Sequence, residues 1–270
     1  MDIKRELEKY NIAPDPLKDQ FFLIDAEVIK KMIASADLKK SDVVLEIGAG
    51  TGALTQELVK KVRRVIAFEV DERFKPFLSK LPKNVEVRYE NAWNYVQLKG
   101  KYLKKKEYNK VVSNLPYSFA EQFLHNLTFL KYDRVILLVP AKFVGKIETN
   151  GIFKSFFKAG VLFEVPKTSF YPTPGTTSLV INLIKQKDPL EEKNLGRFLR
   201  QYLYQHESQL IKNSLREGLI RYQSLTNTKN LTKNEARKII NKKKIPQTLL
   251  DQPPLKSEIY DLVEQAFKEK

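Results

Sequence analysis

Residues 43–52 read VVLEIGAGTG. The first five form a short apolar run that is typical of a buried strand, and residues 53–62 have the pattern of a helix. Three of the chain's 10 glycines stand within this stretch, at positions 48, 50 and 52. Glycine allows a positive φ angle and lets a ligand approach the backbone, and the N-terminus of the next helix offers free N–H groups. The stretch therefore predicts a strand, a loop and a helix that bind a nucleoside-containing ligand.

Strand-like and helix-like segments alternate around this stretch. Further strands are expected at 64–70, 85–89, 111–114 and 134–139, and helices at 26–36, 72–80 and 119–130. Two more strands, at 161–165 and 178–184, have no long helix between them, and we expect them to pair antiparallel at the sheet edge. This order predicts an α/β fold with right-handed crossovers, namely a Rossmann-like domain over residues 1–185 with a seven-stranded, mostly parallel sheet.

The chain changes character after residue 185. Helical patterns are expected at 190–220, 233–241 and 256–267, with a polar, loop-like stretch between the first two. The remaining length is too short for a second sheet. We therefore predict a small all-helical domain over residues 186–270.

Charge and composition narrow the class of partner. The chain has 48 Lys and Arg against 32 Asp and Glu, a formal net charge of +16, and basic runs at 104–106, 237–238 and 242–244. Such an excess favours a polyanion, with nucleic acid first and an anionic membrane surface second. No apolar run approaches the roughly 18 residues of a membrane span, and the first ten residues lack the apolar core of a signal peptide. With no cysteine and no metal-ligand spacing, we expect an intracellular, soluble protein without a metal site.

Two acidic residues bear on which nucleoside the loop binds. Glu69, at the end of the second strand, can accept hydrogen bonds from ribose hydroxyls. Gly48, Gly50 and Ala53 also satisfy the dinucleotide pattern G-x-G-x-x-G/A, so a nicotinamide-dependent oxidoreductase stays open. Glu46, just before the first glycine, would repel a pyrophosphate and favours S-adenosylmethionine instead.

Asn114-Leu115-Pro116-Tyr117 follows the fourth strand, where open α/β sheets place ligands. The exocyclic amine of adenine is a poor nucleophile, because its lone pair is delocalised into the ring. The Asn114 side-chain oxygen and the Leu115 carbonyl, held rigid by Pro116, would accept its two N–H bonds and localise that lone pair. The ring of Tyr117 offers a stacking surface for a flipped-out base. The tetrad therefore predicts adenine N6-methylation.

The sequence resembles the ribosomal RNA adenine N6,N6-dimethyltransferases, a family related to the erythromycin-resistance rRNA methylases. The resemblance is carried by residues 7–12 (LEKYNI), 20–25 (QFFLID), 43–55 (VVLEIGAGTGALT), 69–71 (EVD), 114–117 (NLPY) and 170–174 (FYPTP) with Ser178. It implies a class I methyltransferase fold with S-adenosylmethionine as methyl donor. It also implies a substrate of two adjacent adenosines near the 3′ end of small-subunit rRNA, each receiving two methyls.

The resemblance implies a role for each matching position. The residues implied to bind the cofactor are Gln20, Phe21 and Leu23 at its methionine end, Glu46, Gly48 and Gly50 in the loop, Glu69 and Val70 at the ribose, Asn91 and Ala92 at the adenine, and Asn114 at the boundary with the base. Those implied to hold the target base are Asn114, Leu115, Pro116 and Tyr117, with Phe170 on its other face. The implied partner is small-subunit rRNA or a pre-30S or 40S-type particle, with a monomeric, cytoplasmic enzyme and no membrane.

Three positions depart from the family pattern. Asn91 replaces the usual acid, Phe21 stands where the family has Asn or His, and residues 138–143 (LVPAKF) replace a Gln-Lys-Glu stretch on the RNA side. Two alternatives share the fold or the chemistry: a non-catalytic RNA-binding or ribosome assembly factor, and a DNA adenine methyltransferase. A measurement of cofactor binding would distinguish the enzyme from the non-catalytic factor. Competition between duplex DNA and rRNA would distinguish it from the DNA methyltransferase.

Overall fold

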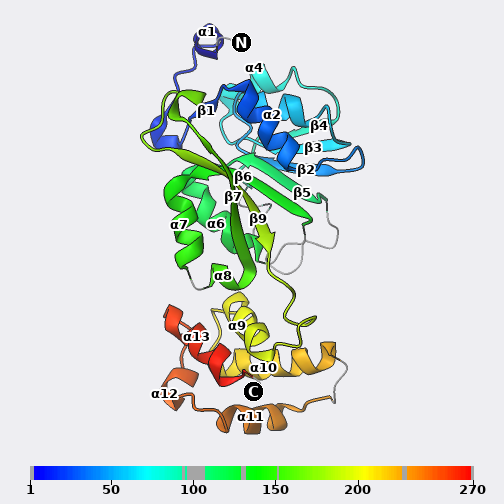
Figure 1. Cartoon of the computed structure of the whole chain (residues 1–270), viewed down its shortest axis with the longest axis vertical. Helices are drawn as coiled ribbons and strands as arrows, with labels where there is room; N and C mark the ends of the chain where they lie inside the picture. The colour runs from blue at the N-terminus through cyan, green and yellow to red at the C-terminus, as the bar shows by residue number, and fades with distance from the viewer. Residues whose placement is uncertain are drawn as a thin grey trace. The chain divides into compact units, whose positions relative to one another are not determined.

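The computed structural model describes residues 3–92, 95, 107–128, 132–150, 152–226 and 230–268. The basic run expected at 104–106 lies outside these ranges. The chain divides into two compact units (Figure 1), one formed by residues 1–147 and 159–184 and the other by residues 148–158 and 185–270.

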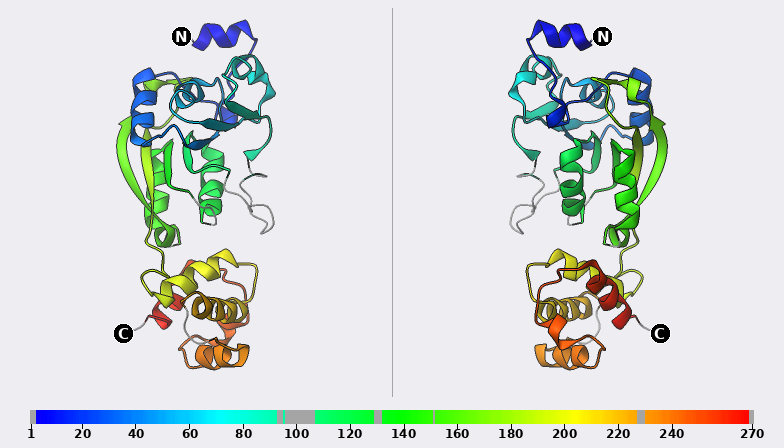
Figure 2. Two further views of the ribbon diagram at one scale, coloured as in Figure 1. Left: turned by 90° about the vertical axis from the view of Figure 1, so that its right-hand side faces the viewer. Right: turned by 90° about the vertical axis from the view of Figure 1, so that its left-hand side faces the viewer.

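The first unit is built on a seven-stranded sheet in the order β4-β3-β2-β5-β6-β9-β7. Its strands are β2 (Val43–Ile47), β3 (Arg64–Phe68), β4 (Val85–Arg88), β5 (Lys110–Asn114), β6 (Arg134–Pro140), β7 (Phe157–Val165) and β9 (Ser178–Lys185). Neighbours from β4 to β6 pair parallel and β9 pairs antiparallel with β6. Both views in Figure 2 show β7 and β9 as long strands side by side at one edge. The predicted Rossmann-like, mostly parallel sheet is therefore confirmed.

A second, two-stranded sheet joins distant parts of this unit. β1 (Phe22–Leu23) pairs antiparallel with β8 (Phe170–Tyr171). The Ile24 N–H also donates to the Ser169 carbonyl at 2.9 Å, and the Ser169 hydroxyl donates to Asp25 at 2.9 Å. This pairing holds the segment before the first long helix against the segment that carries Phe170.

Helices precede or connect the strands of the first unit. They are α1 (Ile3–Lys9), α2 (Ala26–Ser35), α3 (Ala53–Leu58), α4 (Lys75–Leu78), α6 (Tyr117–Leu127) and α7 (Ala141–Thr149), with 3₁₀ turns η1 (Pro16–Lys18), η2 (Glu72–Phe74) and η3 (Lys167–Ser169). The N-terminus of α2 is capped by Asp25, whose carboxylate accepts the N–H groups of Glu27 and Val28. The predicted helix over 53–62 ends at Leu58, because β3 begins only six residues later and the chain must turn toward it.

The second unit contains only helices. They are α8 (Phe153–Phe156), α9 (Leu195–Gln205), α10 (Ile211–Leu225), α11 (Lys233–Asn241), α12 (Gln247–Leu250) and α13 (Ser257–Ala266). α9 packs against α10 and α13. The buried Arg200 of α9 pairs with Asp261 at 2.5 Å and Glu264 at 2.7 Å on α13. A Cβ at Gly196 would lie 2.4 Å from the Glu264 carbonyl oxygen, so only glycine permits this helix contact.

The boundary between the units differs from the predicted single break after residue 185. Residues 148–158 belong with the helices of the second unit. The centroids of the Phe156 and Tyr204 rings lie 5.8 Å apart, and the Gln201 amide donates to the Ser155 carbonyl at 2.6 Å. These contacts with α9 join a segment from the middle of the chain to the C-terminal helices.

A buried ion pair between Lys110 and Asp42 lies at the start of β5. Lys110 Nζ lies 3.0 Å from Asp42 and also donates to the carbonyls of Ala36 and Asp37. Burial alone would raise the pKa of Asp42, but hydrogen bonds from Asn109, Lys39 and Lys110 hold that pKa below its ordinary value. The ionised form of Asp42 therefore contributes to folding.

We expect Lys110→Met to lower the free energy of unfolding by about 3 kcal/mol, because it leaves a buried carboxylate without its cation. The folded-state pKa of Asp42 is lowered, so its stabilisation is present above its unfolded pKa and is lost as the pH falls through the folded value. The variant should therefore lose less stability on acidification than the wild type. Urea unfolding at several pH values measures both effects. Lys30→Met, which breaks an exposed pair with Glu27, serves as the control and should change stability by less than about 0.5 kcal/mol.

Candidate active site

A cavity of about 650 Å³ opens at the carboxyl ends of β2, β3 and β5 in the first unit. Its lining includes every site residue predicted from sequence: Gln20, Phe21, Leu23, Glu46, Gly48, Gly50, Glu69, Val70, Asn91, Ala92, Asn114, Leu115, Pro116, Tyr117 and Phe170. The structure thus brings all of them around one space. Which of them bind the cofactor and which bind the base stays a prediction.

The glycine loop needs the backbone freedom of glycine and is packed against the tetrad. Gly48 has a φ angle of 78° and Gly50 a φ angle of 53°, both in the left-handed region. A Cβ at Gly48 would lie 3.1 Å from Pro116 Cγ, and one at Gly50 would lie 3.2 Å from the Phe22 ring. Any side chain here would therefore press on the residues that surround the cavity.

Glu69 fixes the loop from the neighbouring strand. One carboxylate oxygen accepts the Gly50 N–H at 2.7 Å, and the other accepts the Asp71 N–H at 2.9 Å. Burial raises the pKa of Glu69, although these backbone hydrogen bonds oppose the rise. Each carboxylate oxygen keeps a further lone pair, so Glu69 can still accept two hydroxyl groups from a ligand.

Glu46 is the second buried acid of the cavity lining. It is only 2% exposed, and its Oε2 atom has no hydrogen-bond partner among the residues that the structure describes. Burial raises the pKa of Glu46 to about 8, with Thr55 lowering it and the negative charge of Glu69 raising it further. A buried acceptor without a partner, beside a second carboxyl group, fits a cationic ligand with hydroxyl groups. S-Adenosylmethionine, with its ammonium group and ribose, is such a ligand.

The tetrad is positioned by the end of β5 and the start of α6. Asn114 Nδ2 donates to the Phe21 carbonyl at 3.3 Å, which leaves Oδ1 as the acceptor of this side chain. The Leu115 N–H donates to the Leu138 carbonyl of β6 at 3.1 Å. The Tyr117 hydroxyl lies 3.1 Å from the Ser178 hydroxyl, so its ring is held at one edge of the cavity. The arrangement can present two oxygen acceptors beside an aromatic face.

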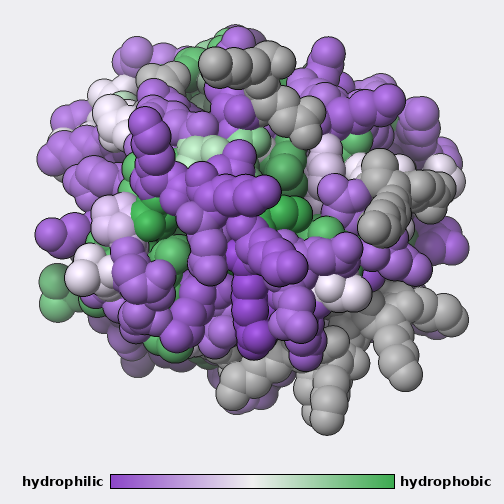
Figure 3. Space-filling view, turned by 90° about the horizontal axis from the view of Figure 1, so that it is seen from below, coloured by the Kyte–Doolittle hydropathy of each residue, from purple (hydrophilic) through white to green (hydrophobic). Residues whose placement is uncertain are grey.

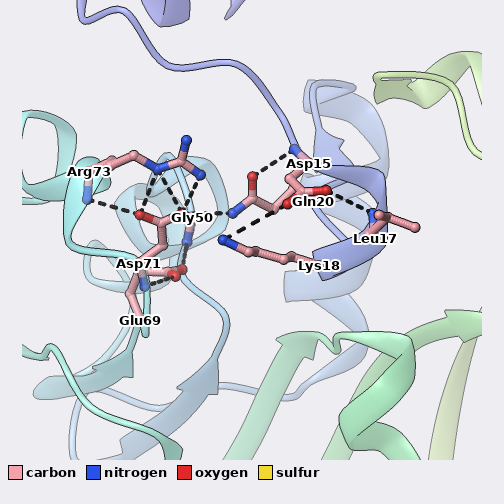
Figure 4. A network of polar contacts seen from close by, with 8 residues as sticks. All are labelled: Asp15, Leu17, Lys18, Gln20, Gly50, Glu69, Asp71 and Arg73. Carbon is pink, nitrogen blue, oxygen red and sulfur yellow. Dashed lines mark hydrogen bonds and ion pairs between the residues drawn. The ribbon is translucent and has the colours of Figure 1, made fainter.

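The segment from Asp15 to Phe21 supplies part of the cavity lining, and Figure 4 shows its polar contacts on the Glu69 side. The Gln20 side chain accepts the Asp15 N–H at 2.9 Å and donates to Asp71 at 2.9 Å. A hydrogen bond from Arg73 is the main cause that lowers the pKa of Asp71 to about 2, so Asp71 is a stable anion for this contact. The segment is therefore tied to the loop after β3, on the Glu69 side of the cavity.

The same segment is tied to the tetrad. Asp19 accepts the Ser118 N–H at 2.7 Å, near the start of α6. The Phe21 and Tyr117 rings stack with centroids 6.1 Å apart and planes 23° apart. Sequence reasoning missed Asp19 and Arg73 and gave Asp71 no separate role. The Asp15-Pro16 pair was the available signal, because it is typical of a capped turn.

The model of the family described as "Ribosomal RNA adenine dimethylase" matches residues 18–250. The chain belongs to the ribosomal RNA adenine dimethylase family. A family relative, "Probable ribosomal RNA small subunit methyltransferase A" of Methanosarcina barkeri, is 35% identical over 209 residues, covering 73% of this chain and 70% of that protein. "Ribosomal RNA small subunit methyltransferase A" of Thermotoga maritima is 31% identical over 230 residues, covering 79% of this chain and 78% of that protein.

The fold of this dimethylase family member is shared with a solved structure, a dimethyladenosine transferase from Plasmodium falciparum. The TM-score is 0.56 at 19% identity, and the match covers 90% of this chain and 95% of that chain. The sequence-based interpretation of an S-adenosylmethionine-dependent rRNA adenine methyltransferase is confirmed, with RNA as substrate. The oxidoreductase, the non-catalytic factor and the DNA methyltransferase are therefore not supported.

Two further observations concern what this dimethylase lacks in the part of the chain that the structure describes. No helix in that part is both long and apolar enough to cross a membrane. No group of three or more His, Asp or Glu residues there could hold a metal ion.

Residues 138–143, which depart from the family pattern, form the end of β6 and the start of α7.

Proposed function

We propose that this enzyme adds two methyl groups to N6 of each of two adjacent adenosines near the 3′ end of small-subunit rRNA. The substrate is the RNA within a pre-30S or 40S-type particle, and the enzyme acts as a monomer in the cytoplasm. The observation that carries the proposal is the orientation of Asn114. Its amide nitrogen is anchored on the Phe21 carbonyl, so its oxygen is available for an adenine amine.

In this proposal Asn114 Oδ1 and the Leu115 carbonyl accept the two N–H bonds of the target amine in the first transfer. In the second transfer the monomethylated amine has one N–H left for these acceptors, and in each transfer the nitrogen gives up one proton to water. The lone pair of that nitrogen is then directed out of the ring system, which makes it a better nucleophile. Tyr117 and Phe170 hold the two faces of the base, Phe170 through the β1–β8 pairing. The residues thus act by positioning the amine and by accepting hydrogen bonds. S-Adenosylmethionine supplies the methyl group when it is bound.

The other predicted site residues of the lining are assigned to the cofactor. Glu69 accepts the ribose hydroxyls, and the Glu46 carboxyl group receives the positively charged amino end. Val70 is 71% exposed although it is apolar and lies at the cavity, which suits a residue that packs on an aromatic ring system. Asn91 and Ala92, beside it in the lining, complete the adenine site.

The direct test is transfer of labelled methyl groups to small-subunit particles that lack these modifications. We expect the label in N6,N6-dimethyladenosine at two neighbouring positions, as found by nuclease digestion and mass spectrometry. Label at other nucleotides would contradict the assigned position, and a single methyl per adenosine would contradict dimethylation. Sedimentation of the free enzyme tests the monomer.

The outer face of α11 is the part of the helical unit best suited to RNA phosphates. The exposed residues Lys233, Arg237 and Lys238 of α11 and Lys242 and Lys244 just after it gather within twelve positions, and none of them forms an ion pair with another described residue. The one acid of α11, Glu235, is engaged in a capping box with Thr232. Figure 3 looks onto this unit, and hydrophilic side chains cover most of the face toward the viewer. We therefore assign this face to the phosphate backbone of structured RNA.

Replacing Lys233, Arg237 and Lys238 together by glutamine should lower the salt dependence of RNA binding. Each lost phosphate contact reduces the slope of log K against log salt by about 0.7 to 0.9, so the slope should fall by about 2. Filter binding to small-subunit rRNA over a salt series measures this. The matched control replaces Lys30, Lys60 and Lys75 by glutamine, since each of these lysines pairs with a glutamate three residues earlier. An equal fall in both triple variants would mean that only net charge matters.

A further inference from the structure

Leu17 is an apolar side chain held out into solvent at the mouth of the cavity. It is 97% exposed, and no other large hydrophobic residue of the described ranges is exposed as much. It belongs to the cavity lining together with Tyr117 and Ser118 of the tetrad region. Leu17 therefore adds little to folding through burial, and its side chain is available to a ligand that enters the cavity.

The turn that carries Leu17 is rigid. Asp15 accepts the Leu17 N–H at 3.0 Å, and Pro16 fixes the first position of η1. Asp19, with a φ angle of 57°, closes the turn by donating its N–H to the Pro16 carbonyl at 3.1 Å. The direction of the Leu17 side chain is therefore set by the backbone, and Figure 4 shows it pointing away from the polar network.

This turn is also fixed relative to both sides of the cavity. Gln20 connects it to Asp71, and Asp19 connects it to the Ser118 N–H. Leu17 therefore keeps a constant place beside the entrance through which a base would reach Asn114. Lys18 follows directly, with a side chain that is 65% exposed and 3.9 Å from Asp15. An apolar tip next to a cation matches a stacked nucleic acid, whose bases are apolar and whose phosphates are anionic.

We propose that Leu17 is a wedge that enters the RNA stack and occupies the space left by the target adenine. Taking a base out of a stack costs free energy, and apolar side chains inserted between bases recover part of it. Leu17 stabilises the state in which the base is in the cavity, and Lys18 contacts a neighbouring phosphate. This inference rests on the proposed function, because it requires an adenine that leaves its stack.

The test compares Leu17→Ala, Leu17→Met and Leu255→Ala on unmethylated small-subunit particles. We expect Leu17→Ala to lower kcat about tenfold, since fewer bound complexes hold the base in the cavity. KM for the particles and the affinity for S-adenosylhomocysteine, measured by calorimetry, should stay within about twofold of wild type. Leu17→Met, which keeps an apolar side chain of similar volume, should recover most of the lost kcat. Leu255 is 77% exposed in the helical unit, so Leu255→Ala should match wild type.

The outcomes distinguish failure of the Leu17 wedge from failure of the proposed function. A wild-type enzyme that transfers no methyl group to the particles contradicts the proposed function. An active wild type with an unchanged Leu17→Ala variant contradicts the wedge alone. Loss of kcat in both the alanine and the methionine variants also overturns it, because an apolar wedge tolerates methionine. Thermal unfolding of each variant should match wild type, since this side chain has no folded-state contacts to lose.

Discussion

Asn114→Ala is expected to lose at least about a hundredfold in turnover, the size of effect seen when one preorganised hydrogen-bonding group at a reacting centre is removed. The variant lacks the oxygen that accepts the adenine N–H in the proposed arrangement, so the lone pair of the amine is no longer directed toward the methyl donor. It also lacks the amide that anchors on the Phe21 carbonyl, so the segment before β1 loses one contact with the tetrad. The first loss acts on the target base and accounts for the expected effect on turnover.

Single-turnover methylation of small-subunit particles at saturating cofactor measures this loss. Calorimetry with S-adenosylhomocysteine should give an affinity near that of wild type, because in the proposed arrangement Asn114 contacts the base and only borders the cofactor. Asn84→Ala is the matched control, since the Asn84 amide contacts only backbone carbonyls away from the cavity. A large fall in cofactor affinity for Asn114→Ala would show that its main role has been misassigned.

Glu69→Ala is expected to have the opposite profile, with cofactor affinity reduced about a hundredfold. The loss combines two charge-assisted hydrogen bonds to the ribose, at about 1.5 to 3 kcal/mol each before compensation. The Gly50 N–H also loses its acceptor, so the glycine loop is held less firmly. Turnover at saturating cofactor should fall much less, because the base site is unchanged.

Calorimetric titration and methyl transfer at increasing cofactor concentration distinguish the two effects. Glu69→Gln is the informative companion, because its amide keeps one oxygen acceptor but turns an N–H donor toward a backbone N–H. Its affinity should lie between those of wild type and Glu69→Ala. A cofactor affinity of Glu69→Ala equal to that of wild type would show that Glu69 does not bind the cofactor.

The glycine loop and the tetrad could be predicted because their chemistry depends on local spacing. Gly48 and Gly50 follow a strand at a spacing that demands a tight turn, and Asn114 to Tyr117 follow another strand at the same sheet edge. By contrast, Asp19 bonds to a residue 99 positions away and Gln20 to one 51 positions away. Polar pairs of this kind leave no periodicity in the sequence, because each partner is an ordinary surface residue until the fold brings them together.

The same reason explains the errors in segment boundaries. The 148–158 segment reads as part of the sheet domain, and only its contacts with α9 place it among the C-terminal helices. α7 was not expected, because it begins at Ala141, directly after β6 ends at Pro140, with no loop residues between them to mark its start. The burial of Lys110 against Asp42 could not be predicted from the sequence either, since a lysine at the start of a strand is usually exposed.

The paired carboxyl groups of Glu46 and Glu69 bear on product inhibition. Both are enclosed at the cavity, and each raises the cost of a second negative charge there. Such a pair holds a ligand with an additional positive charge more tightly than a neutralised one. Demethylation of the sulfonium removes that charge, so in the proposed arrangement the two carboxyl groups favour the fresh cofactor over the spent one. In the proposed reaction the enzyme exchanges the cofactor four times per RNA, once for each methyl group, and this difference speeds each exchange.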